Sequence, residues 1–113
     1  MVNGITVLVK EEMTKQTIKA IWNNIAITID YVPNYSNSVK ELTGETLSHL
    51  EVRSVNQRKL PITETGYRSH FTSKKEVDTF GGAEPYVLTW LNQEAQSKEW
   101  QDYILSSKQL TLF

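Results

Sequence analysis

The chain has 113 residues, about the length of one domain, and its three Trp, five Tyr and three Phe supply large apolar side chains for a single core. It has no cysteine, which excludes a disulfide framework, a thiolate zinc site and a cysteine nucleophile. A net charge of −1 argues against a generally cationic nucleic-acid binder.

The N-terminal third of the chain predicts a β-hairpin. Apolar residues alternate with polar ones at Ile18, Ala20 and Trp22, and alternation resumes from Ile25 to Tyr31. This period of two is typical of strands with one buried face. The intervening Asn23-Asn24 suits a two-residue turn, because Asn tolerates positive φ angles.

Residues 5–10 are a candidate for a further strand or for part of a tail. This apolar run is too short for a signal peptide or a membrane span, so we expect a cytoplasmic protein that does not contact a membrane.

The centre of the chain predicts two more strands. Residues 33–45 are rich in Asn, Ser, Pro and Gly and predict a surface loop. Strands are expected over residues 47–55 and within 66–72, with a basic turn at 56–59 between them. Residues 73–82 are expected to connect the last strand to the C-terminal part.

The C-terminal part predicts two helices. Val87, Trp90 and Leu91 fall at helical spacing, and so do aromatic and apolar residues after Ser97, which could cap the second helix. We therefore expect an α+β fold, with an antiparallel sheet of four to five strands followed by two C-terminal helices packed on one face. We expect one domain over residues 1–106 and a recognition peptide over 107–113.

The block Leu-Pro-Ile-Thr-Glu-Thr-Gly-Tyr-Arg-Ser-His-Phe at residues 60–71 resembles a block of small proteins from bacteria and their mobile elements. That resemblance brings no described activity with it. It therefore implies neither a catalytic residue nor a cofactor, and we assign none.

Strand alternation around this block predicts a polar cluster. The apolar residues Tyr67 and Phe71 are expected to face inward, which places the alternate residues of this strand outward. In the preceding strand Leu50 and Val52 are expected to face inward. If the two strands pair, one outer surface gathers five polar side chains: His49, Glu51, Arg53, Arg68 and His70.

Three interpretations of this surface stay open. Residues 49–75 hold six basic residues against two acidic ones, so the segment could bind anions or DNA through Arg53, Arg58, Lys59, Arg68, Lys74 and Lys75. His49, Glu51 and His70 could form a two-histidine, one-carboxylate metal site. The third interpretation is a solvated, salt-bridged sheet face without a ligand.

The last five residues, Gln-Leu-Thr-Leu-Phe, resemble the short peptide with which many bacterial proteins bind the DNA sliding clamp. The resemblance implies that Gln109, Leu110, Leu112 and Phe113 each carry contacts. We expect the second helix to end near Leu105, which leaves a tether of about three residues before this motif. The competing interpretation is that this apolar end packs on its own domain.

The leading hypothesis is a non-catalytic accessory protein of bacterial or mobile-element DNA metabolism, recruited to the sliding clamp by its C-terminal peptide. One alternative is a small metal-dependent or nucleic-acid-processing enzyme that uses His49, Glu51 and His70. The other is a self-associating module whose tail inserts into a neighbouring copy.

Overall fold

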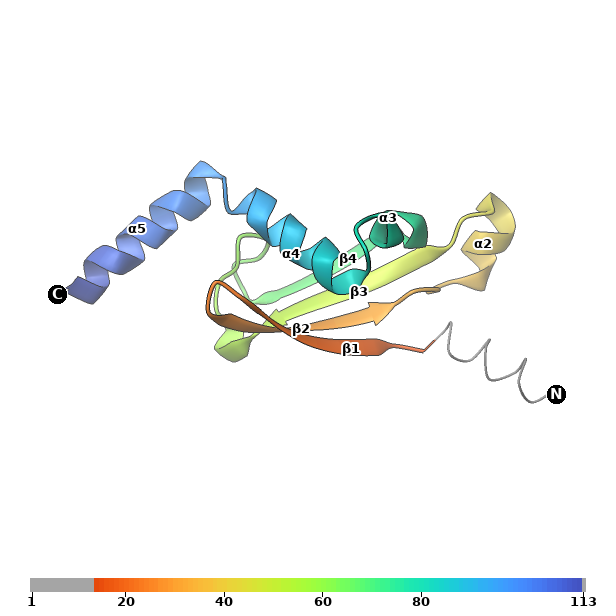
Figure 1. Cartoon of the computed structure of the whole chain (residues 1–113), viewed down its shortest axis with the longest axis horizontal. Coiled ribbons are helices and arrows are strands. Elements are labelled where there is room, and N and C mark those ends of the chain that lie inside the picture. Colours follow the sequence, from red (N-terminus) through yellow and green to blue (C-terminus); the bar gives the residue numbers. More distant parts are fainter. Residues whose placement is uncertain (1–13, 113) are drawn as a thin grey trace.

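The computed structural model describes residues 14–112 of the chain, with side chains as far as residue 107. Its sheet is antiparallel and four-stranded, in the order β1-β2-β3-β4, and helices follow or interrupt the strands (Figure 1). The predicted α+β class is confirmed. In chain order the elements are β1 Gln16–Trp22, β2 Ile25–Val32, α2 Asn37–Thr43, β3 Leu47–Ser54, the 3-10 turn η1 Val55–Gln57, β4 Tyr67–Ser73, α3 Lys74–Thr79, α4 Ala83–Glu94 and α5 Lys98–Leu112.

The predicted hairpin is confirmed. Strands β1 and β2 pair from Gln16 opposite Tyr31 to Trp22 opposite Ile25. Asn23 and Asn24, with φ angles of 46° and 66°, make the two-residue turn. Both angles lie in the left-handed region that such a hairpin turn requires and that Asn accepts at low cost. The strand that residues 5–10 could form lies outside the described residues.

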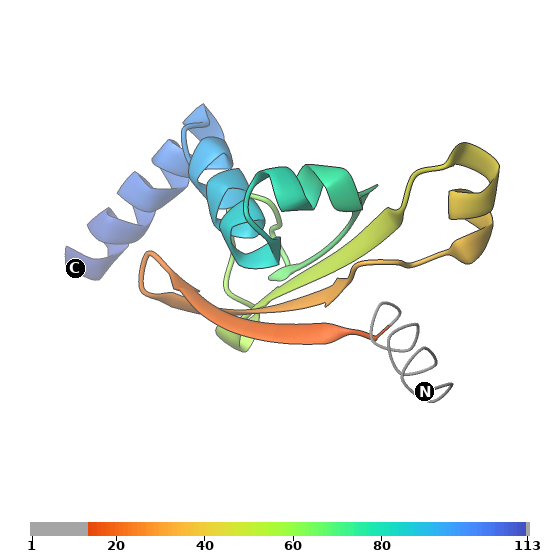
Figure 2. The same ribbon diagram turned by 45° about the vertical axis from the view of Figure 1, so that its right-hand side comes forward.

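The core lies between one face of the sheet and the helices α3 and α4. Figure 2 shows both helices on the same side of the sheet. Ile29, Leu50 and Val52 reach the core from the sheet, and Val87 and Leu91 reach it from α4; all five are fully buried. Within residues 14–112 no helix covers the opposite face (Figure 1). That face is mostly exposed, although Asp30 of β2 is only 9% exposed there. Strand β4 has no fully buried residue on either side.

Two short helices replace segments that the sequence predicted as loop or connection. Helix α2 begins where the Ser36 hydroxyl accepts a hydrogen bond from the Val39 amide, and it ends at Gly44, which has a φ of 78°. Helix α3 begins where the Ser73 hydroxyl accepts a hydrogen bond from the Glu76 amide. These helices of seven and six residues depend on local caps rather than on a long apolar stripe.

Helix α5 leaves the sheet and extends beyond the hairpin end of the domain (Figure 1). No helix among the described residues is long and apolar enough to cross a membrane.

Candidate functional site

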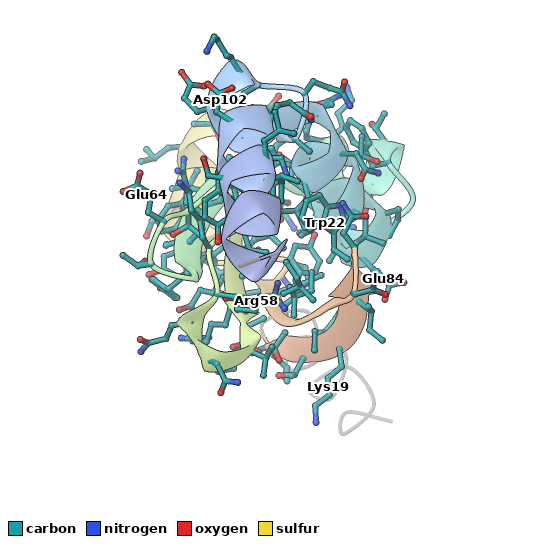
Figure 3. The ribbon with its side chains drawn as sticks, turned by 90° about the vertical axis from the view of Figure 1, so that its left-hand side faces the viewer. Lys19, Trp22, Arg58, Glu64, Glu84 and Asp102 are labelled. Carbon is teal, nitrogen blue, oxygen red and sulfur yellow. The ribbon has the colours of Figure 1, made fainter. Side chains whose placement is uncertain are left out.

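Helix α5 is anchored to the domain by its first turns. Ser97 caps it, since its hydroxyl accepts a hydrogen bond from the Trp100 amide at 3.2 Å, as the sequence predicted. The Trp100 side chain is only 5% exposed and its ring lies 5.8 Å from that of Trp22 at the end of β1. Figure 3 shows Trp22, at the hairpin end of β1, beside α5. One turn further along, the Lys59 ammonium lies 4.5 Å from the centre of the Tyr103 ring.

The second half of α5 carries the clamp-like motif. The helix continues to Leu112, so the predicted end near Leu105 is wrong, and no separate tether precedes the motif. A continuous run of residues with adequate helix propensity follows Leu105. The side chains of residues 108–112, and Phe113 altogether, lie outside the described part of the chain, so the contacts expected of Gln109, Leu110, Leu112 and Phe113 remain predictions.

The polar cluster predicted on one surface is divided between the two faces of the sheet. Strands β3 and β4 do pair, but His49 lies opposite Phe71, and Leu50 lies opposite His70. Directly opposed residues of an antiparallel pair share a face. His49 and Glu51 therefore lie on the exposed face, whereas His70 lies on the helix-covered face.

This register corrects the prediction that Tyr67 and Phe71 face inward; they are 42% and 49% exposed. It also rules out the metal site that would combine His49, Glu51 and His70, because the three cannot converge on one ion. Among the described residues no group of three or more His, Cys, Asp or Glu side chains is placed to hold a metal ion.

The six basic residues proposed for anion binding do not form a single patch. Arg53 lies on the exposed face and Arg68 on the covered face. Arg58 and Lys59 lie in the loop after η1, while Lys74 and Lys75 begin α3 at the opposite end of β4. Lys74 is engaged by Asp78, with 2.7 Å between the charged atoms.

The exposed face of the sheet, which we call the open face, carries cross-strand rows of side chains. Its described members, from the strand register, are Thr17, Lys19, Ile21, Ala26, Thr28, Asp30, Val32, Leu47, His49, Glu51, Arg53, Tyr67, Ser69, Phe71 and Ser73. At its centre the Arg53 guanidinium contacts the carboxylates of Asp30 at 2.9 Å and Glu51 at 3.1 Å. The same guanidinium lies 4.9 Å from the centre of the Tyr67 ring.

Hydrogen bonds extend this network to both outer strands. The Thr17 hydroxyl of β1 donates to Asp30 at 2.8 Å, and the Tyr67 hydroxyl of β4 donates to Glu51 at 2.7 Å. The bond from Tyr67 holds the pKa of Glu51 below its usual value, helped by the positive charge of Arg53 and opposed by burial. The same hydrogen bond raises the pKa of Tyr67. The network thus favours the charged form of the Glu51 carboxylate on the open face.

An aromatic cluster occupies the end of the open face that lies next to α2. The His49 ring lies 4.4 Å from that of Phe71, and Tyr35 lies 5.2 Å from His49 and 5.1 Å from Phe71. His49 also makes a 2.7 Å hydrogen bond between its Nε2 and the Ser69 hydroxyl. Tyr35 is half exposed, so the cluster presents an apolar surface to solvent.

On the covered face, His70 and Arg68 pack against α4. The His70 ring lies 4.5 Å from that of Trp90, and its Nε2 is 3.0 Å from the Tyr86 hydroxyl. Burial lowers the pKa of His70, and the charge of Arg68 lowers it further. The side chain is therefore held neutral as part of the packing between β4 and α4.

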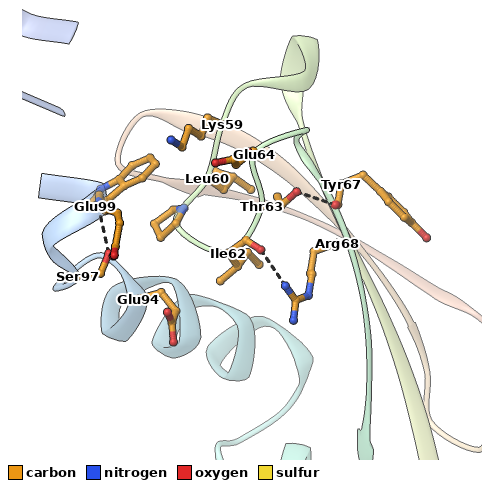
Figure 4. Close-up of a pocket in the computed structure, with 12 residues that line it drawn as sticks. Lys59, Leu60, Ile62, Thr63, Glu64, Tyr67, Arg68, Glu94, Ser97 and Glu99 are labelled. Atoms are coloured by element: carbon orange, nitrogen blue, oxygen red, sulfur yellow. Dashed lines mark hydrogen bonds between the residues drawn. The ribbon is translucent and has the colours of Figure 1, made fainter. Parts of the chain in front are cut away.

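A groove of about 570 Å³ runs between the loop at residues 59–64 and the junction of α4 with α5 (Figure 4). Buried Leu60, Ile62 and Trp100 contribute apolar surface to it. Its charged lining residues are of both signs: Lys59, Glu64, Arg68, Glu94 and Glu99. Arg68 donates to the Ile62 carbonyl at 3.2 Å and lies 5.5 Å from the centre of the Trp90 ring. This arginine thus holds the loop against α4.

Asp30 and Tyr67 were not among the predicted site residues, although both belong to the central network. Alternation along β2 contains the signal for Asp30, because inward Ile27, Ile29 and Tyr31 leave it facing outward. The outward direction of Tyr67 had no such signal, since an aromatic residue on a strand usually faces the core.

The described chain is a small α+β domain with one helix-covered and one open sheet face, extended by a C-terminal helix. A family model for the KlcB third domain matches residues 15–100, which span β1 to the first turn of α5. The chain belongs to this family. No curated protein matches, and no solved structure matches. The clamp-like motif lies beyond the matched residues.

Proposed function

We propose that this chain is a non-catalytic accessory protein of bacterial or mobile-element DNA metabolism that binds the DNA sliding clamp through its last five residues. Membership of the KlcB third-domain family supports the broader part of this proposal, an accessory protein associated with mobile elements. Clamp binding rests on the resemblance of the Gln-Leu-Thr-Leu-Phe sequence at residues 109–113 to clamp-binding peptides.

The observation that carries the proposal is the position of this motif at the end of a helix that extends beyond the sheet (Figure 1). Trp100 fixes the first turns of α5 on the domain. A partner can therefore approach the end of α5 without displacing the core. In this proposal Leu110, Leu112 and Phe113 enter an apolar groove of the clamp, and the Gln109 amide pairs at its rim.

Binding in an extended form would require the last turn of α5 to unwind. That turn is the least costly part of the helix to open, because the final four carbonyl groups of a helix have no intrahelical partner. Ordering a short peptide on a groove consumes part of the binding free energy, so we expect an affinity in roughly the micromolar range.

A capture experiment with immobilised bacterial clamp tests the proposal. The intact chain should be retained and a chain lacking residues 109–113 should not. The matched control is Leu105→Ala, which removes a 59% exposed leucine from the same helix upstream of the motif and should leave capture unchanged. Equal retention of the intact and shortened chains, or retention of neither, would refute clamp binding through this peptide.

A further inference from the structure

The open face holds apolar and charged rows in a definite order along the strands. Beyond the pair of Leu47 and Ser73 at the α2 end of the sheet, the first row that includes β2 is Val32, His49 and Phe71. The second contains the carboxylates of Asp30 and Glu51. The third row contains Lys19 and Arg53, and the last contains Ile21 and Ala26. Val55 borders the same surface hollow as Ile21 and Ala26 and extends this last row. The order is therefore apolar, acidic, basic, apolar.

This order is self-complementary. Consider a two-fold axis that lies in the plane of the interface, perpendicular to the strands and between the acidic and basic rows. Rotation about this axis reverses the order of the rows in the second copy and keeps each strand over the same strand of that copy. It places acidic rows over basic rows and apolar rows over apolar rows. An isologous contact requires such self-complementarity. Facing sheets pack about 10 Å apart at about −30°, a gap that paired Glu and Arg side chains can span.

We infer that the open face is a homodimer interface, in which Glu51 of each subunit pairs with Arg53 of the partner subunit. Both side chains have exposed surface for this contact, 48% for Arg53 and 22% for Glu51. Tyr35, Val55, Tyr67 and Phe71, each more than 40% exposed, lie on or beside this face and would supply apolar contact. Tyrosine, phenylalanine and arginine are enriched at protein interfaces.

The charge of the face favours a second copy over a nucleic acid. Two carboxylates lie beside the two cations, and Arg53 already contacts both carboxylates. A phosphate backbone would meet no net positive surface there, although positive charge supplies most of nucleic-acid affinity.

The size of the face sets the expected strength of the dimer. Four strands spaced about 4.8 Å apart, with about seven residues of about 3.3 Å each, give a flat area of roughly 440 Å² per subunit. Two copies give a total of roughly 900 Å², which is below the roughly 1,200 Å² of stable interfaces and in the range of weak, transient ones. We therefore expect a reversible dimer with a dissociation constant in roughly the micromolar range.

Sedimentation equilibrium on the whole chain, from about 1 µM to about 1 mM, tests this inference. Arg53→Glu and Glu51→Arg should each raise the dissociation constant at least about tenfold, because like charges then face one another. An equimolar mixture of the two variants should form a heterodimer. The double variant should dimerise within about threefold of the natural chain, because the guanidinium introduced by Glu51→Arg would lie opposite Asp30 and keep that carboxylate paired. Lys40→Glu, a charge reversal on exposed α2 away from this face, is the matched control and should have no effect.

A second variant covers the case in which Arg53→Glu fails to fold, as judged by circular dichroism. Thr28 lies between Lys19 and Arg53 in the basic row. Thr28→Glu therefore meets cations within its own subunit but faces Asp30 of the partner subunit, and it should weaken the dimer. A natural chain that stays monomeric at about 1 mM, or a folded Thr28→Glu variant that dimerises like the natural chain, would overturn the inference. Clamp binding involves the end of α5, so either proposal can fail without the other.

Discussion

Replacing Trp100 with alanine should loosen α5 and lower the free energy of unfolding by about 3–5 kcal/mol, the usual cost of removing a buried Trp side chain. Trp100 is 5% exposed and contacts the rings of Trp22 and Tyr103 at 5.8 and 5.2 Å. The loss is large against the roughly 5–15 kcal/mol expected for a domain of this size. The loss of stability is large because the Trp100 side chain buries the first turns of α5 against the core.

Urea unfolding followed by circular dichroism measures this effect. Leu105→Ala on the same helix is the control, since its side chain is 59% exposed and exposed substitutions usually change stability by less than about 0.5 kcal/mol. A loss below about 1 kcal/mol for Trp100→Ala, with the control unchanged, would refute the role of Trp100 as the anchor of α5.

Three further predictions concern the sheet and its turns. Tyr67→Phe removes the main cause of the lowered pKa of Glu51, so a carboxyl titration by NMR should show the pKa of Glu51 rising toward its ordinary value of 4.5; an unchanged pKa would contradict the Tyr67 hydrogen bond. The folded-state pKa of His70 lies below its ordinary value of 6.5. The unfolded chain therefore takes up the His70 proton first, and the free energy of unfolding should fall as pH drops below about 6.5. Urea midpoints at pH 5 and 7.5 should differ less in His70→Gln than in the natural chain, and an unchanged difference would refute the lowered pKa of His70. Gly66 has a φ of 82° and an added Cβ would lie 2.6 Å from the Gln57 backbone, whereas a Cβ on Gly44, with a φ of 78°, would meet open space. Gly66→Ala should therefore cost more than the roughly 1 kcal/mol expected for Gly44→Ala in thermal or urea unfolding, and equal losses would contradict the close packing at Gly66.

The sequence predicts the strands well where local chemistry determines them. Alternation from Ile18 to Tyr31 and the Asn23-Asn24 turn predicted the hairpin. A strand with one buried face shows apolar residues at every second position, and a turn with two positive φ angles favours Asn. Leu50 and Val52 were correctly expected to face the core for the same reason.

The orientation of β4 could not be read from its own residues. The inward direction of His70 and Arg68 depends on Trp90 and Tyr86, which lie far along the chain on α4 and offer ring contacts and a hydroxyl partner. The outward Tyr67 is stabilised by Glu51 and Arg53 on β3. These compensations arise only after the chain has folded, so the predicted polar cluster was wrong although the predicted strand pairing was correct.

A fluorescence titration of the clamp with labelled intact chain measures whether the end of α5 binds the sliding clamp. We expect a dissociation constant in roughly the micromolar range. Leu112→Ala combined with Phe113→Ala should weaken binding at least about tenfold, and Leu105→Ala should bind like the natural chain. No binding, or equally strong binding by all three proteins, would show that the end of α5 does not bind the clamp.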